Sequence, residues 1–253
     1  MIEMVQNILQ LPPLAYAERT IPKSFFERNF ILTSAEKKLL SIPFLPLKST
    51  WLAELNTKTI NTSSVENTLQ SYTRIPIFVV ELSGEHWINH LDKLCNLYHK
   101  YIPFQVLLFI HTKEQYCVSA ATKTINQNDK EKRVLEEEYR TPEISLLYKA
   151  DIEESFREQL NFQNLNRINL KTVFDSYVAA IINYRRATKA GNFETRKEAK
   201  LVNQNLNELE QIEKESAVLK TKLLKTKDIR EKIDLQMKLQ TLKDRRQKLN
   251  EIL

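Results

Sequence analysis

Glycine is scarce in this sequence. Gly84 and Gly191 are the two glycines among 253 residues, and neither lies in a glycine-rich motif. Loops that wrap around phosphate groups need several residues at positive φ, a conformation that glycine adopts without steric cost. The sequence therefore excludes a glycine-rich nucleotide-binding loop. No serine or cysteine lies between the paired glycines of a nucleophile elbow, which argues against that class of hydrolase.

Cysteine and long apolar segments are scarce as well. Cys95 and Cys117 are the two cysteines, and both lie in apolar segments that are typical of a protein core. We interpret them as reduced and buried, which suits a cytoplasmic protein, and we disfavour a disulfide or a metal-binding pair. No apolar run approaches the roughly 18 residues of a transmembrane helix, so we expect no membrane partner.

The positive charge is concentrated at one end of the chain. The whole sequence carries 38 Lys and Arg against 32 Asp and Glu, a net charge of +6. Residues 1–184 hold 20 basic and 21 acidic side chains, whereas residues 185–253 hold 18 and 11. A localised basic surface is typical of a protein that binds a polyanion. The alternative is a solvated helix surface in a lysine-rich protein.

The strongest folding signal lies between Ile75 and Ile110. Residues 75–82 and 104–110 are apolar runs too short for helices and rich in strand-forming residues. Between them, Pro103 ends a segment with helical periodicity, which predicts a helix over 86–102. Its predicted buried face comprises Trp87, Ile88, Leu91, Leu94, Cys95, Tyr98 and Ile102. We expect two neighbouring strands covered by this helix.

The remaining pattern predicts an α+β fold with a small mixed or antiparallel sheet covered by helices, followed by a C-terminal helical hairpin (coiled coil). Further expected strands are 47–55, 116–121 and 134–139, and the last of these is expected at a sheet edge. Residues 56–64 are expected to be a loop or a frayed strand end. Further expected helices include 151–161 and 170–187. We predict a sheet domain over 1–150, connecting helices over 151–192, and the hairpin over 193–253.

The C-terminal segment is nearly continuous helical sequence from residue 194 onward. Its two apolar stripes change phase across residues 224–228, where Thr226 or Asp228 can cap a new helix. This favours an antiparallel hairpin, in which the two stripes bury each other; one interrupted helix in a homodimer is the alternative. Near the expected tip lie six candidate residues for nucleic-acid or partner binding: Lys220, Lys222, Lys225, Lys227, Arg230 and Lys232.

Two carboxylates, Glu54 and Glu81, lie on consecutive predicted strands. The expected order of strands and helices is similar to the restriction-endonuclease core, which needs an acid on one strand and Glu-x-Lys on the next to hold a metal. Here Ser83 occupies the position of that lysine. A nuclease using Glu54 and Glu81 is therefore the secondary hypothesis, and Glu81 as a strand-end ion-pair or capping residue is the primary one.

Other polar candidates have equally plain interpretations. His86 and His90 have metal-ligand spacing, but the glutamate of zinc proteases is absent between them, which favours a surface pair. Lys23 follows Pro22 and is a candidate phosphate ligand; Lys123, at a strand end, is another, and the alternative for both is plain surface. We predict no metal and no cofactor.

Five segments together resemble a bacterial family, domain of unknown function 4391. They are IPKSFF (21–26), WLAELNTKTIN (51–61), IPIFVVELS (75–83), YIPFQVLLFI (101–110) and KLLKTKDIREKIDLQMKLQTLKDRRQKL (222–249). Members of this family resemble components of bacterial defence loci, encoded beside DNA methyltransferases and helicases of the restriction type. The resemblance implies a defence context and identifies no catalytic residue.

These observations lead to one expected function and one alternative. We expect a non-enzymatic accessory subunit of an anti-phage defence or restriction-like system. Its protein partners would include the helicase and DNA methyltransferase of the locus, and the basic tail would help to hold nucleic acid. The alternative is a divergent or degenerate metal-dependent nuclease.

Overall fold

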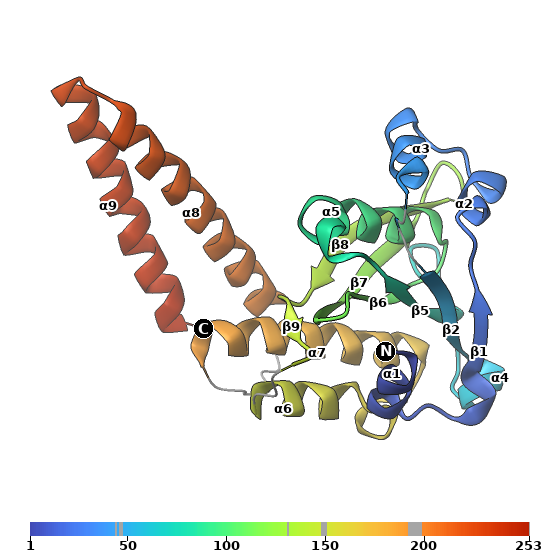
Figure 1. Ribbon diagram of the computed structural model, residues 1–253. Coiled ribbons are helices and arrows are strands. Elements are labelled where there is room, and N and C mark those ends of the chain that lie inside the picture. The colour runs from blue at the N-terminus through green and yellow to red at the C-terminus, as the bar shows by residue number, and fades with distance from the viewer. Residues whose placement is uncertain (44, 46–47, 131, 148–150, 192–198, 253) are drawn as a thin grey trace. The chain divides into compact units, whose positions relative to one another are not determined.

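The computed structural model describes residues 1–43, 45, 48–130, 132–147, 151–191 and 199–252 (Figure 1). The chain divides into two compact units, residues 1–184 and residues 185–253. The division falls within helix α7 (Leu170–Ala190), whose last six residues, 185–190, belong to the second unit. Among the described residues, no helix is both long and apolar enough to cross a membrane.

The first unit is built on a mixed seven-stranded sheet with the order β1-β2-β5-β6-β7-β8, in which β9 also pairs with β7. Strands β5 and β6 are parallel, and the other pairs are antiparallel. The strands are β1 (Tyr16–Thr20), β2 (Lys48–Asn56), β5 (Arg74–Glu81), β6 (Leu107–His111), β7 (Gln115–Ile125), β8 (Arg133–Arg140) and β9 (Ile144–Ser145). A separate small hairpin consists of β3 (Val65–Glu66) and β4 (Ser71–Tyr72).

The predicted strand–helix–strand unit is confirmed. Helix α5 (Gly84–Tyr101) connects the parallel neighbours β5 and β6, whose register places Ile77 opposite Leu107. The side chains of Trp87, Leu94 and Cys95 are almost completely buried. Each apolar run is buried because a parallel pair within a sheet is covered on both of its faces.

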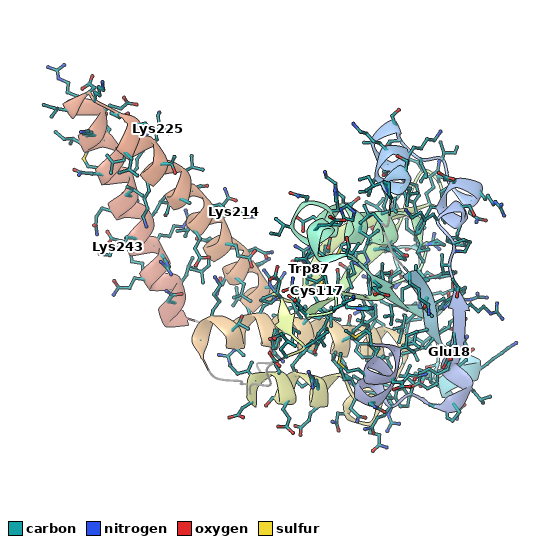
Figure 2. The ribbon with its side chains drawn as sticks, viewed as in Figure 1. Glu18, Trp87, Cys117, Lys214, Lys225 and Lys243 are labelled. Atoms are coloured by element: carbon teal, nitrogen blue, oxygen red, sulfur yellow. The ribbon has the colours of Figure 1, made fainter. Side chains whose placement is uncertain are left out.

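Helices cover the two faces of the sheet (Figure 1). Helix α5 packs on one face together with α2 (Ser24–Asn29) and α3 (Ser34–Ser41), and the shared core includes Phe78 and Cys117. Trp87 and Cys117 mark this core in Figure 2. The other face carries α1 (Ile2–Leu9), α6 (Asp151–Leu160) and the part of α7 that belongs to this unit. The short helices η1 (Pro13–Ala15) and η2 (Phe162–Asn164) complete the unit.

Two expectations about helices of the first unit were wrong. Ile88, assigned to the buried face of α5, is 87% exposed, because Trp87 and Leu91 already point into the core. The expected loop after β2 begins with a short helix, α4 (Thr57–Ile60). The carbonyl oxygen of the Asn56 side chain accepts hydrogen bonds from the backbone N–H groups of Lys58 and Thr59, which caps this helix.

The second unit contains the predicted antiparallel pair of helices, α8 (Ala199–Lys225) and α9 (Ile229–Ile252). Asp228 caps α9, because its carboxylate accepts a hydrogen bond from the Arg230 N–H at 2.7 Å. Gly191 follows α7 with φ at 78°, a conformation that other residues rarely adopt, and its N–H is bonded to the Ala187 carbonyl.

Lys123 is buried, contrary to the interpretation as surface. It lies on β7 with 2% of its surface exposed, and its ammonium nitrogen donates to the carbonyls of Ile102 and Phe104 at 2.7 and 2.6 Å. Burial lowers the pKa of Lys123 to about 7, and the positive charge of Arg133 contributes in the same direction. A neutral amine has two N–H donors, so both carbonyls remain bonded after deprotonation.

Truncation of Leu94 tests the assignment of the α5 core face. Leu94 is fully buried in this core, so Leu94→Ala is expected to lower the free energy of unfolding by about 2–5 kcal/mol. Ile88→Ala is the matched control on the same helix, and its exposed side chain should change stability by less than about 0.5 kcal/mol. Equal effects of the two substitutions in urea denaturation would contradict the assignment.

The buried lysine predicts a pH dependence of stability. The unfolded chain keeps the Lys123 proton up to about pH 10.5, whereas the folded chain loses it near pH 7. Between these values unfolding takes up a proton, so this group makes stability rise with pH. Relative to Lys123→Met, the wild type should gain up to about 1.4 kcal/mol of unfolding free energy per pH unit from about pH 7 to 9.

Lys113→Met provides the control for this titration, because Lys113 is exposed and lies just before the same strand. Its unfolding free energy should follow that of the wild type across the pH range. A difference between wild type and Lys123→Met that does not vary with pH would show that Lys123 keeps an ordinary pKa in the folded protein.

Candidate functional site

Ion pairs connect the two helices of the C-terminal hairpin. Arg245 on α9 bonds to Glu208 on α8. Nearer the tip, Lys222 Nζ on α8 lies 3.4 Å from Glu231 Oε1 on α9. Residues late in α9 thus lie beside residues early in α8, which establishes the antiparallel arrangement. Exposed pairs contribute little to stability, so these ion pairs fix the register of the helices more than they stabilise them.

The base of the hairpin is built around Arg185. This side chain is 7% exposed, and one of its guanidinium nitrogens bonds to Asn207 and to Glu210 at 2.9 and 2.8 Å. Its other terminal nitrogen bonds to Asn203, which is completely buried. A buried guanidinium needs several acceptors to offset its lost hydration. The C-terminal part of α7 is therefore joined to α8 by directed polar interactions.

The tip of the hairpin is strongly basic. Residues 220–232 contain six cationic and two acidic side chains, a net charge of +4. All six predicted cations are exposed: Lys220, Lys222, Lys225, Lys227, Arg230 and Lys232. One acid, Asp228, caps α9, and the other, Glu231, pairs with Lys222. The predicted basic residues thus flank the turn that connects α8 to α9, and Lys225 marks this end of the hairpin in Figure 2.

Burial of the two apolar stripes is incomplete. Leu235 on α9 is buried, but Ile229, Ile233 and Met237 are 74%, 51% and 58% exposed. These three residues are spaced by four, so they share one face of α9, and the helical period turns that face away from Leu235. The expectation that the two stripes bury each other thus holds for Leu235 and is wrong for Ile229 and Ile233, and α9 keeps an uncovered apolar stripe.

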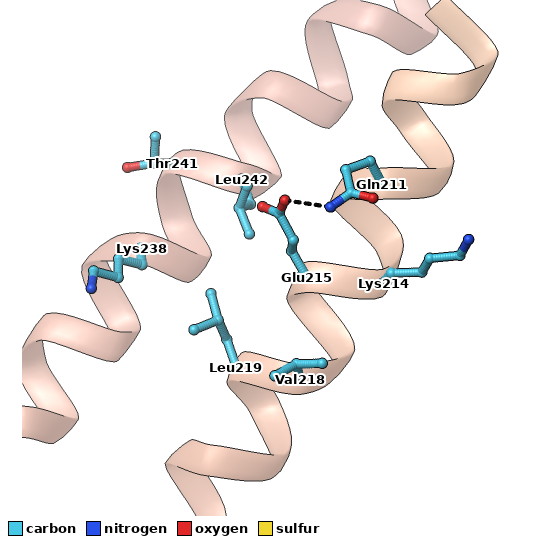
Figure 3. Close-up of a pocket in the computed structure, with 8 residues that line it drawn as sticks. All are labelled: Gln211, Lys214, Glu215, Val218, Leu219, Lys238, Thr241 and Leu242. Atoms are coloured by element: carbon cyan, nitrogen blue, oxygen red, sulfur yellow. Dashed lines mark hydrogen bonds between the residues drawn. The ribbon is translucent and has the colours of Figure 1, made fainter.

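A groove between the two helices adds apolar surface to the same unit (Figure 3). Its volume is about 630 Å³, and Val218, Leu219 and Leu242 supply its apolar lining. Lys214 and Lys238 are among its polar residues. Charged residues beside an apolar groove are typical of surfaces that take a further helix.

The carboxylates of Glu54 and Glu81 do not form one site. Glu54 lies opposite Pro76, five residues before Glu81 on β5, which separates them by about 17 Å along the strand. Strand alternation also places them on opposite faces of the sheet, because Pro76 shares the face of Phe78. Glu81 instead lies beside Lys48 and His111 in the register. The two acids therefore cannot share a metal in this arrangement.

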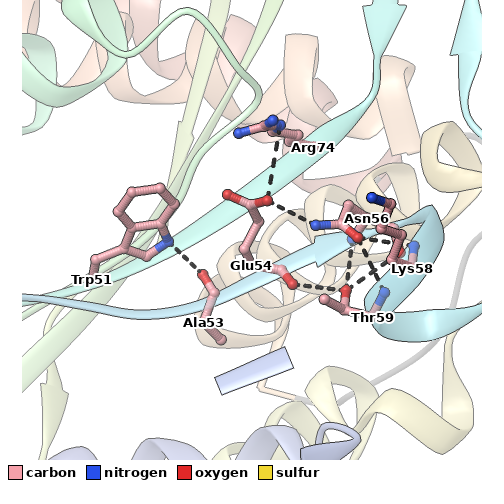
Figure 4. Close-up of polar contacts among 7 residues, drawn as sticks. All are labelled: Trp51, Ala53, Glu54, Asn56, Lys58, Thr59 and Arg74. Atoms are coloured by element: carbon pink, nitrogen blue, oxygen red, sulfur yellow. Dashed lines mark hydrogen bonds and ion pairs between the residues drawn. The ribbon is translucent and has the colours of Figure 1, made fainter. Parts of the chain in front are cut away.

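Glu54 belongs to a different pocket, which the sequence did not reveal. A bulge in β2 between Trp51 and Ala53 changes the register, so that Trp51 lies opposite Phe78 and Glu54 opposite Pro76. Trp51 and Glu54 consequently rise from the same face although they are three residues apart (Figure 4). Without the bulge, residues at this spacing would point to opposite faces.

Glu54 is held by polar neighbours (Figure 4). Its Oε1 accepts a hydrogen bond from Asn56 Nδ2 at 2.7 Å, and Arg74 Nε lies 3.8 Å away. The Arg74 guanidinium also lies over the ring of Phe104, with 5.5 Å between guanidinium carbon and ring centroid. Contacts within the chain therefore hold both Glu54 and Arg74 in position.

A second irregularity brings Arg19 to this pocket. The register of β1 shifts between Tyr16 and Arg19, and Glu18 between them has φ at 47°, which is uncommon outside glycine. Gln6 donates a hydrogen bond to the Glu18 carboxylate at 2.6 Å and supports this conformation. Arg19 then lies opposite Trp51. Bulges of this kind redirect side chains and are frequent beside functional sites.

The other polar candidates from the sequence, Lys23, His86 and His90, contact neighbouring parts of the chain. Lys23 Nζ donates to the carbonyl of Ile42, at the end of α3, at 2.8 Å, and burial lowers its pKa. His86 and His90 form a ring pair 5.3 Å apart, and His86 contacts the Pro43 carbonyl. In the described part of the chain, no three His, Cys, Asp or Glu side chains are grouped as a metal site.

Comparison with known proteins identifies the family of this chain and matches it to no individual protein. Searches of curated proteins and of solved structures each returned no match. The family model described as "Domain of unknown function (DUF4391)" matches residues 9–245. The match includes the whole sheet and most of the hairpin, so it is not limited to the helical tail that any coiled coil could imitate. The chain belongs to the DUF4391 family.

Proposed function

We propose that this protein is a non-enzymatic interaction subunit whose C-terminal hairpin binds both a polyanion and a partner protein. The observation that carries the proposal is the hairpin surface, which combines an uncovered apolar stripe on α9 with a tip of net charge +4. Exposed apolar residues arranged on one helix face are typical of a surface covered by another protein.

Nucleic acid is the polyanion that this tip suits best. Lysine and arginine side chains around a turn can reach a phosphate backbone without reading base sequence. Of the six cations at the tip, Lys222 has an ion-pair partner in Glu231. The proposed interaction is therefore sequence-independent and weakens with salt, because binding releases counterions from the nucleic acid.

Defence against foreign DNA is the biological setting that we propose. Its support is the resemblance of this family to components encoded beside restriction-type helicases and DNA methyltransferases. A subunit that binds a partner through one surface and nucleic acid through another suits such an assembly. The separation of Glu54 from Glu81 favours this role over a nuclease.

Charge reversal at the tip tests nucleic-acid binding. In the triple variant Lys225→Glu, Lys227→Glu and Arg230→Glu, the affinity for duplex DNA is expected to fall at least about tenfold. The slope of log affinity against log salt should become shallower by about 0.9 for every phosphate group that the variant no longer neutralises. Fluorescence anisotropy over a salt titration measures both quantities.

A matched triple variant distinguishes the effect of charge at the tip on DNA affinity from the effect of a lower total charge. Lys37→Glu, Lys38→Glu and Lys113→Glu change the total charge by the same amount at exposed positions in the first unit. This control should keep the salt slope of the wild type. If both triple variants lose affinity equally, the tip is an ordinary solvated surface and the proposed role of the tip is wrong.

The apolar stripe predicts the site of protein association. The double variant Ile233→Asp and Met237→Asp is expected to lose the proteins that co-purify with the tagged wild-type chain from its host, because a charge cannot be buried in a helix interface at low cost. Folding should be little affected, since both side chains are more than half exposed.

The control for this experiment is Ala217→Asp with Thr221→Asp, which adds the same charge at two exposed positions, again four residues apart, on the other helix of the hairpin. It should retain the co-purifying proteins. Light scattering of the pure chain shows whether the partner is a second copy, in which case the first double variant becomes monomeric. Retention of every partner by both double variants would refute the role of the stripe.

A further inference from the structure

The pocket around Glu54 lies in the first unit and has no part in the proposed function of the hairpin. Its volume is about 430 Å³, and its lining includes Arg19, Trp51, Glu54 and Arg74. It thus combines an aromatic ring, a carboxylate and two guanidinium groups. Two bulges, one in β1 and one in β2, are needed to bring these groups to the same face of the sheet.

Trp51 provides the pocket with a surface on which a planar ring can stack. Trp51 packs at one side on Phe78, with ring centroids 5.9 Å apart, and its indole N–H is bonded to the Ala53 carbonyl at 3.0 Å. The ring is therefore fixed in orientation, and it is partly exposed in the pocket. A fixed tryptophan is a good platform for a planar ring, because stacking requires little further ordering.

The carboxylate of Glu54 supplies acceptors for hydrogen bonds. A carboxylate has about four acceptor positions on its two oxygens, and the Asn56 amide uses one on Oε1. The remaining positions can accept two parallel N–H groups. Among nucleobases, guanine presents such a pair in its ring N–H and adjacent amino group, whereas uracil has no amino group.

The arginines supply the complementary charge. Arg19 is exposed, and the Arg74 side chain is 52% exposed. With Glu54, the three charged residues leave the pocket with a net positive charge, which favours an anionic ligand. Guanidinium groups bind phosphate through paired, charge-assisted hydrogen bonds.

We propose that this pocket binds a guanine nucleotide, with the base stacked on Trp51 and hydrogen-bonded to Glu54 and the phosphate held by Arg19 and Arg74. The volume suits one nucleotide. The nucleotide can be free or can be the end of a nucleic-acid strand, since both present the same base and phosphate.

Calorimetry with the full-length protein tests this proposal. GMP should bind more tightly than CMP or AMP, and UMP and inorganic phosphate should bind weakest. Trp51 fluorescence should be quenched on binding, whereas Trp87, which is 2% exposed, should not respond. A single-stranded oligonucleotide with a 5′-phosphorylated terminal guanosine distinguishes the sources: binding of this oligonucleotide without GMP binding identifies a strand end.

Two variants and one control locate the ligand. Glu54→Gln should remove the preference for GMP over AMP, and Arg74→Met should weaken GMP binding about tenfold or more. Arg167→Met is the matched control, because the Arg167 guanidinium carbon also lies over a phenylalanine ring, 5.1 Å from the centroid of Phe162. It should bind GMP within about twofold of the wild type.

Three results would overturn the proposal. The first is no saturable binding of GMP or of the oligonucleotide up to about 1 mM. The second is equal binding of inorganic phosphate, which would reduce the pocket to an anion site. The third is equal loss of affinity in Arg74→Met and Arg167→Met, which would place the ligand elsewhere. Circular dichroism of each variant checks that a loss of binding is not a loss of folding.

Discussion

The burial of two parallel strands beneath one crossover helix is the constraint on which the first unit depends. Strands β5 and β6 occupy the centre of the sheet, and their side chains are buried on both faces. Helix α5 must therefore cover one face, and α1, α6 and α7 must cover the other. Strand β2 pairs with β5 along its whole length, and the bulge between Trp51 and Ala53 lies opposite Phe78 and Ile77 in the middle of that pairing.

The sheet edges show how this arrangement avoids association through unpaired strands. Strand β8 lies at one end of the strand order and carries Glu136, Glu137 and Glu138 in succession. Charged side chains on an edge strand oppose pairing with another chain. At the opposite edge, β1 is short and bulged, which has the same effect and also positions Arg19. Protection of the edge and construction of the pocket thus depend on the same irregularity.

Sequence patterns predicted those parts of the structure that depend on periodicity. The apolar runs around residues 75–82 and 104–110, the helix between them and the phase change at residues 224–228 were sufficient to predict the central unit and the hairpin. Periodicity cannot decide between neighbouring residues at the border of a stripe, which explains the error at Ile88. Periodicity also predicts that a lysine near a strand end is exposed. Lys123 is buried instead, because the carbonyls of Ile102 and Phe104 accept hydrogen bonds from its amino group.

The candidate pocket could not be predicted because it depends on register. Sequence places Glu54 and Glu81 on consecutive strands, and only the pairing shows that they lie on opposite faces. The bulge that unites Trp51 with Glu54 has no signature in residue type, since the residue in the bulge is an ordinary leucine, Leu52. Arg19 and Arg74 come from strands far apart in the chain, so their association with Glu54 follows from tertiary structure alone.

The uncovered stripe on α9 has a consequence for the amount of this protein that a cell can hold. Ile229, Ile233 and Met237 expose apolar surface that is a liability for aggregation unless something covers it. Molecules made in excess of whatever covers the stripe are those most exposed to aggregation and to proteolysis. The partner protein proposed above would cover this stripe, so synthesis of the two proteins in a fixed ratio would limit both losses.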